Sequence, residues 1–198
     1  MLRHVYVISL LVLLAACGTS PKTDFYILNS QQDVAAPVAS GHEKLAIGVW
    51  TVKLPDLLDR SEIVTRNSQF EIELADFSWW ITDLEKNMTQ LIATEIGRRL
   101  YSDDVVASPW ESYRKNNYQV KILIDRFDGF LGGEVVLSGV WRLLDASGKK
   151  SLSTEMFRFN VNATDKSYKT MVVELSKLTV QLAEQVTNSI VVSESNKK

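Results

Sequence analysis

Three consecutive segments in the second half of the chain restrict its fold more than any other feature. Each has 10 to 12 residues, is rich in β-branched and aromatic side chains, and is separated from the next by Gly- and Asp-containing turn residues. Strands joined by such short turns pair with their neighbours in antiparallel fashion, so we expect a β-meander. Its strands are residues 118–127, 133–144 and 151–162, with turns at Asp128-Gly129 followed by Gly132-Gly133, and at 145–148.

Two amphipathic segments flank this meander and are predicted to be helices over residues 78–101 and 166–191. In each, apolar residues recur at steps of three and four and form one stripe. Asp76 or Ser78 is expected to cap the first helix, and Arg98 and Arg99 suit its C-terminal end. The stripes are Phe77, Trp80, Leu84, Met88, Leu91, Ile92 and Ile96 in the first helix, and Tyr168, Met171, Val172, Leu175, Leu178, Leu182, Val186 and Ile190 in the second.

Shorter strands are expected in the first half of the chain. Alternation around Asn67-Ser68 predicts a hairpin whose buried face carries Phe70, Ile72 and Leu74. The whole pattern predicts the α+β class: a single domain over 24–192, with a mixed, largely antiparallel sheet packed against two amphipathic helices, and a polar tail at 193–198. The remaining short strands are 24–28, 45–52 and 104–107.

The N-terminus carries an apolar run from Val5 to Ala16, interrupted only by Ser9, behind a start that contains Arg3. A membrane-spanning helix needs about 20 apolar residues, and this run is shorter. Its length and flanks are those of a secretory signal peptide, which we place at residues 1–16.

The run ends at the one cysteine of the chain, in the sequence Leu14-Ala15-Ala16-Cys17. This sequence resembles the lipobox of bacterial lipoproteins; the alternative is a chance cysteine in an ordinary export signal. The resemblance implies cleavage before Cys17, acyl chains such as palmitate on Cys17, and a tether over 17–23. A residue other than Asp after the cysteine, here Gly18, implies the periplasmic face of the outer membrane. A single cysteine also excludes an intramolecular disulfide.

Charge and composition exclude several classes of function. Without residues 1–16 the chain loses Arg3, which leaves 21 basic against 24 acidic residues, so nothing favours nucleic acid as a partner. One histidine, His42, remains, which is too few ligands for a structural zinc, and we expect no metal or cofactor. Nucleophile-elbow, phosphate-loop and dinucleotide motifs are absent, so we expect a protein that is not an enzyme. Asp59 and Arg60 in LPDLLDR form either a turn with a local ion pair or part of a binding surface.

Taken together, the ordered segments resemble the ABC-type transport auxiliary lipoproteins, the family of PqiC-like and YmbA-like membrane-integrity lipoproteins. The matching segments are the lipobox, DFYIL, IGVWTVKLPDLLDRSEIVTR, ELADFSWWITDLEKNMTQLIATEI, and YQVKILIDRFDG with VVLSGVWRLLDASG. The resemblance implies an oligomeric adaptor that works at the outer membrane beside the MCE-domain protein of an ABC-type lipid transporter; a ring would suit a tubular partner of this kind.

Trp79 departs from the family pattern because it adds an aromatic residue beside Trp80. If Trp80 lies on the helical stripe, Trp79 points about 100° away, either as an exposed interface residue or packed under a neighbouring segment. Other hypotheses for function are a direct lipid carrier with an apolar groove, an assembly lipoprotein of an outer-membrane β-barrel complex, and, last, an envelope hydrolase.

Overall fold

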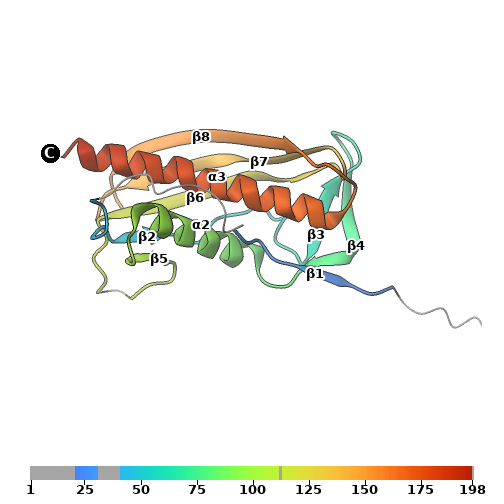
Figure 1. Ribbon diagram of the computed structural model, residues 1–198, viewed down its shortest axis with the longest axis horizontal. Helices are drawn as coiled ribbons and strands as arrows, with labels where there is room; N and C mark the ends of the chain where they lie inside the picture. The colour runs from blue at the N-terminus through green and yellow to red at the C-terminus, as the bar shows by residue number, and fades with distance from the viewer. Residues whose placement is uncertain (1–20, 31–40, 112, 198) are drawn as a thin grey trace, which may run out of the picture.

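The computed structural model describes residues 21–30, 41–111 and 113–197. It has the predicted α+β class, with two sheets and two long helices arranged in one elongated body (Figure 1). The signal peptide, the lipobox residues Leu14, Ala15 and Ala16, and Cys17 and Gly18 lie outside the described residues.

The larger sheet contains the predicted meander. β6, β7 and β8 pair in antiparallel fashion along their whole lengths. On the other side of β6, β2 pairs in parallel with both β6 and β5, which completes the order β5-β2-β6-β7-β8. The bounds are β2 Ile47–Val49, β5 Val105–Ala107, β6 Tyr118–Gly129, β7 Glu134–Leu144 and β8 Ser151–Asn162.

The smaller sheet has the order β1-β4-β3 and lies at one end of the molecule (Figure 1). The predicted hairpin is confirmed as β3, Glu62–Arg66, and β4, Ile72–Trp80, while β1, Asp24–Tyr26, adds in parallel to β4. The prediction that Phe70 is buried is wrong. It lies before β4 begins and is 95% exposed, and Leu74 is also largely exposed, because the alternation did not show where the strand starts.

The first helix begins later than the sequence pattern predicts. α2 runs over Leu84–Leu100, because residues 78–80 pair with β1 as the last part of β4. Its N-cap is Asp83, and neither Asp76 nor Ser78, both of which belong to the strand, has this role. α3 runs over Tyr168–Ser195 with Ser167 as N-cap, so it continues into the predicted polar tail. There the Tyr118 hydroxyl donates to Glu194 at 2.6 Å.

Both helices cover the same face of the larger sheet, with α3 over β6 to β8 and α2 beside it over β2 and β5 (Figure 1). The helix-facing residues of the strands are fully buried, as in the cross-strand pair of Ile122 and Trp141. Between the helices, Arg99 of α2 is 1% exposed and donates to Glu184 of α3 at 3.0 Å. In the described part of the chain, no helix is both long and apolar enough to cross a membrane.

One buried carboxylate joins the two sheets. Asp128 of β6 accepts hydrogen bonds from Arg66 of β3 at 2.9 Å and from Arg126 at 2.7 Å. The predicted turn at Asp128-Gly129 is therefore wrong, because both residues belong to β6. Gly129 is required there for close approach: a Cβ at this position would come within 2.6 Å of the Glu134 carbonyl oxygen.

Candidate interaction surface

The small sheet brings together most of the residues that the sequence singled out. Trp79 lies near the end of β4, and Asp59 and Arg60 lie in the loop before β3. The loop contacts the end of β4, because the Trp80 amide donates to the Ser61 carbonyl at 2.7 Å. The structure thus places these three candidates at the same end of the molecule.

An exposed apolar surface covers the outer side of this sheet. Ser78 and Trp80 of β4 are buried, so the alternating residues Phe77, Trp79 and Ile81 project the other way. Phe25 of β1 is paired with Trp79, and the two rings meet edge to face with centroids 6.5 Å apart. We call these four residues the aromatic face: Phe25, 56% exposed, Phe77, 44% exposed, Ile81, 60% exposed, and the half-buried Trp79.

The expected geometry of the Trp79-Trp80 pair is therefore corrected. The two side chains lie on opposite faces of a strand and are not offset by a turn of helix. Trp80 packs inward, 6.3 Å from the ring of Phe127. Trp79 combines both expected alternatives, since it packs against Phe25 and remains partly exposed. Its indole N–H is buried and has no acceptor among the described residues.

Asp59 and Arg60 line a polar hollow of about 440 Å³ between their loop and the start of α2. The loop is a turn, as expected: the Leu58 amide donates to the Pro55 carbonyl at 2.8 Å. The expected local ion pair is not formed by either residue within the described part of the chain. At the rim of the hollow, the Asp83 carboxylate accepts from the Lys86 amide, and this hydrogen bond lowers the pKa of Asp83.

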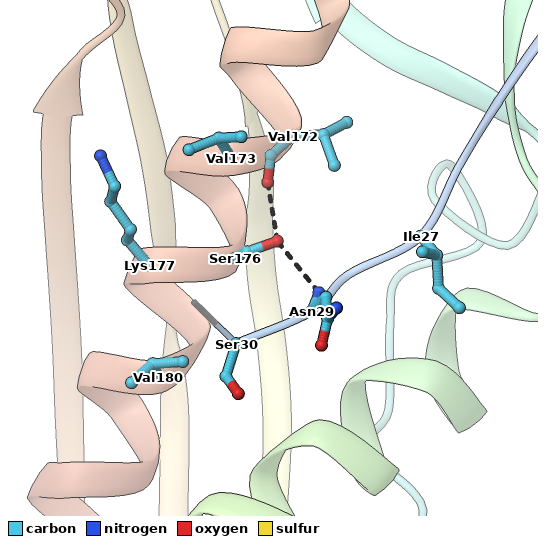
Figure 2. A pocket seen from close by; sticks show the side chains of 8 residues that line it. All are labelled: Ile27, Asn29, Ser30, Val172, Val173, Ser176, Lys177 and Val180. Carbon is cyan, nitrogen blue, oxygen red and sulfur yellow. Dashed lines mark hydrogen bonds between the residues drawn. The ribbon is translucent and has the colours of Figure 1, made fainter. Parts of the chain in front are cut away.

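A second hollow, which the sequence did not reveal, lies where the chain leaves β1 (Figure 2). It is an apolar groove of about 450 Å³ between this segment and α3. Three valines and Ile27 supply most of its surface, and Lys177 stands at its edge, paired with Glu174 at 2.7 Å. The lining residues are Ile27, Asn29, Ser30, Val172, Val173, Ser176, Lys177 and Val180.

Segment 27–30, the chain that follows β1, is fixed to both helices. Asn87 of α2 accepts from the Leu28 amide at 2.8 Å and donates to the Leu28 carbonyl at 3.2 Å. The Ser176 hydroxyl of α3 accepts from the Asn29 amide at 3.3 Å and donates to the Val172 carbonyl at 2.8 Å (Figure 2). The groove exists because this segment crosses between the helices. The sequence DFYIL by itself does not predict that path.

The described residues contain no group of three or more His, Cys, Asp and Glu side chains that could hold a metal ion. The geometry is that of surfaces and a groove, which can bind a partner or an apolar chain.

The family model of ABC-type transport auxiliary lipoprotein components matches residues 26–187. This range includes nearly all of both sheets and both helices, and the chain belongs to this family. Among curated protein sequences, none matches the chain.

Solved structures share the fold at low sequence identity. A protein of the DUF330 family from Xanthomonas campestris has a TM-score of 0.73 at 12% identity, covering 89% of this chain and 100% of its own. An uncharacterized protein has a TM-score of 0.70 at 18% identity, covering 86% and 99%. The PelC dodecamer from Paraburkholderia phytofirmans is more distant, with a TM-score of 0.46 at 13% identity, covering 79% of this chain and 92% of its own.

Proposed function

We propose that this family member is a non-catalytic, lipid-anchored adaptor of an MCE/ABC-type lipid-transport system that supports outer-membrane integrity. The observation that carries the proposal is the family match over residues 26–187, together with the sequence Leu14-Ala15-Ala16-Cys17. In this proposal Cys17 carries the acyl chains, and the domain stands on the periplasmic face of the outer membrane, as Gly18 suggests. Several acyl chains are needed for lasting attachment, because a single chain binds a membrane only marginally.

The MCE-domain protein is the proposed partner. The aromatic face and the polar hollow at Asp59 and Arg60 support a binding role, because the first exposes large apolar side chains and the second brings charged side chains together at one end of the domain. A homo-oligomeric ring would suit a tubular partner and belongs to the same proposal.

The apolar groove favours a second candidate function, the direct carrying of lipid. Its volume of about 450 Å³ lies within the range of small-ligand sites, and its walls are mainly aliphatic. A carrier would hold one acyl chain along α3 beside Val172, Val173 and Val180.

The deciding experiment is to tag the full chain at its C-terminus, extract it from membranes with mild detergent, and identify what it retains. Proteins and phospholipids are both measured by mass spectrometry. The Cys17→Ala variant, which cannot be acylated, is the control for dependence on the anchor.

Recovery of an MCE-domain protein with ABC-transporter subunits is the expected result. Recovery of phospholipid without those proteins would replace the adaptor with the carrier. Recovery of a β-barrel alone would replace it with an assembly lipoprotein.

A further inference from the structure

The aromatic face stands out because three large apolar side chains, Phe25, Phe77 and Ile81, stay exposed at one small sheet beside the half-buried Trp79. The described residues do not cover it, whereas Trp141, Trp80 and Phe157 of the same domain are buried. An exposed apolar patch of this kind marks a surface on which something docks.

The position of β1 indicates what lies nearest to this face. Phe25 follows Cys17 by only eight residues. An extended chain spans at most 3.3–3.6 Å per residue, so Cys17 lies within about 28 Å of the Phe25 backbone. β1 belongs to the sheet at one end of the molecule, whereas α3 ends at the opposite end (Figure 1). Acyl chains on Cys17 would therefore keep this end of the domain, which carries the aromatic face, near the bilayer.

The chemistry of the face suits a phospholipid surface. Tryptophan and phenylalanine are favoured at the boundary between headgroups and acyl chains. One carboxylate adjoins the face: Glu62 of β3 is the cross-strand partner of Trp79. Lys22 precedes β1 and Asp24 is its first residue, so the two supply one charge of each sign. The charged groups beside the face are thus not predominantly basic, so the contact depends on the apolar side chains and does not require anionic lipid.

We infer that the aromatic face docks on the zwitterionic phospholipid surface that carries the anchor, and so fixes the orientation of the domain on the membrane. This inference rests on the proposed acylation of Cys17. Phe25, Phe77 and Ile81 enter the headgroup region, while Trp79 supports Phe25 from behind.

The test uses the single cysteine of the chain. Because acylation consumes the Cys17 thiol, a cysteine introduced elsewhere is the one free thiol of the lipidated protein. The full lipidated chain, carrying either Phe77→Cys or Met156→Cys, is labelled with a nitroxide and reconstituted into phosphatidylcholine vesicles. Met156 is the matched control, since it is apolar, 86% exposed and located on the sheet face away from the helices. Electron paramagnetic resonance then compares collisions of each label with oxygen and with a water-soluble nickel chelate.

We expect a several-fold higher oxygen-to-nickel collision ratio at position 77 than at position 156, unchanged by added salt. Equal, water-like ratios at both positions, with protein still floating with the vesicles, would overturn the docking but leave the anchor intact. Failure of the protein to float would overturn the anchor itself. Protection of position 77 that is also present in detergent and rises with protein concentration would overturn the docking in favour of a contact between protein chains. Circular dichroism checks that both variants are folded.

Discussion

At the scale of single residues, Asp128 links the two sheets through its side chain. It is 2% exposed and is held by two guanidinium groups, one of which comes from the other sheet. Removing this carboxylate would destabilise the fold, because Arg66 and Arg126 would keep their positive charges in a partly desolvated site without the partner that neutralises them.

We therefore predict that Asp128→Ala lowers the free energy of unfolding by about 3 kcal/mol. This value is at the low end of the range for breaking a buried ion pair, because Arg66 and Arg126 are partly exposed. Chemical denaturation monitored by circular dichroism measures the change. Asp125→Ala, at an exposed position of the same strand, is the control and should change stability by less than about 0.5 kcal/mol. Equal effects of the two changes would contradict the proposed role of Asp128.

The residue-level expectations that were correct concern side chains whose neighbours lie close in the chain, although the local ion pair at Asp59 and Arg60 and the helix cap were not among them. The turn at Pro55 to Arg60 was predictable from its proline and aspartates, and the Arg98 and Arg99 positions at the end of α2 were predictable from the helix dipole. Asp128 was taken for a turn residue, because its two arginine partners and the close approach at Gly129 depend on pairings that the sequence does not display.

At the scale of elements, the junction between β4 and α2 decides where the strand stops and the helix starts. Phe77, Trp80 and Leu84 are spaced as on a helix, but parallel pairing with β1 keeps residues 78–80 extended. The helix can begin only after this pairing ends, and Asp83 then caps it through the Lys86 amide at 3.0 Å.

This assignment predicts that Asp83→Ala lowers the free energy of unfolding by about 1 kcal/mol, the typical loss for an N-cap. Asp76→Ala, the cap that the sequence pattern favours, should cost less than about 0.5 kcal/mol. Thermal or urea unfolding of the two variants measures the difference. A larger loss for Asp76→Ala would place the helix start back in the segment that forms β4.

The pH dependence of the Asp83 effect follows from its lowered pKa. A carboxyl whose pKa is lower in the folded state stabilises the fold fully above its unfolded pKa, about 3.9 for Asp. The contribution is lost as the pH falls through the folded pKa. The difference in stability between the wild type and Asp83→Ala should therefore be constant at neutral pH and disappear in acid.

At the scale of the whole molecule, segment 27–30 connects three parts that are distant in the sequence. It follows β1, crosses the junction of the two helices, and is bound by Asn87 on one side and Ser176 on the other. The small sheet and the helix pair are thereby held in one arrangement.

Asn87→Ala should loosen this segment while leaving α2 in place. We predict about fivefold faster hydrogen–deuterium exchange at the Leu28 amide, equivalent to a lost hydrogen bond of about 1 kcal/mol. Gln90→Ala, at an exposed position of the same helix, is the control and should leave Leu28 unchanged. Unaltered exchange in Asn87→Ala, or faster exchange throughout α2, would contradict this assignment.

The fold class, the meander and the family were all accessible from the sequence, because turn residues and alternation act locally and the segments keep a characteristic order. The parallel pairs of β1 with β4 and of β2 with β5 and β6 were not accessible, since each joins segments more than 50 residues apart. The aromatic face and the groove depend on these pairs, so of the candidate surface only Trp79, Asp59 and Arg60 were found in advance.

The parallel pairing of β1 with β4 also has a mechanical consequence. A tension applied at residue 24 along the strand axis would load the β1–β4 hydrogen bonds together, in shear, and would not open them one at a time. Behind β1, the bonds of Asn87 and Ser176 to segment 27–30 would carry the remaining load to both helices. A force on the N-terminal tether would thus be distributed over the small sheet and both helices.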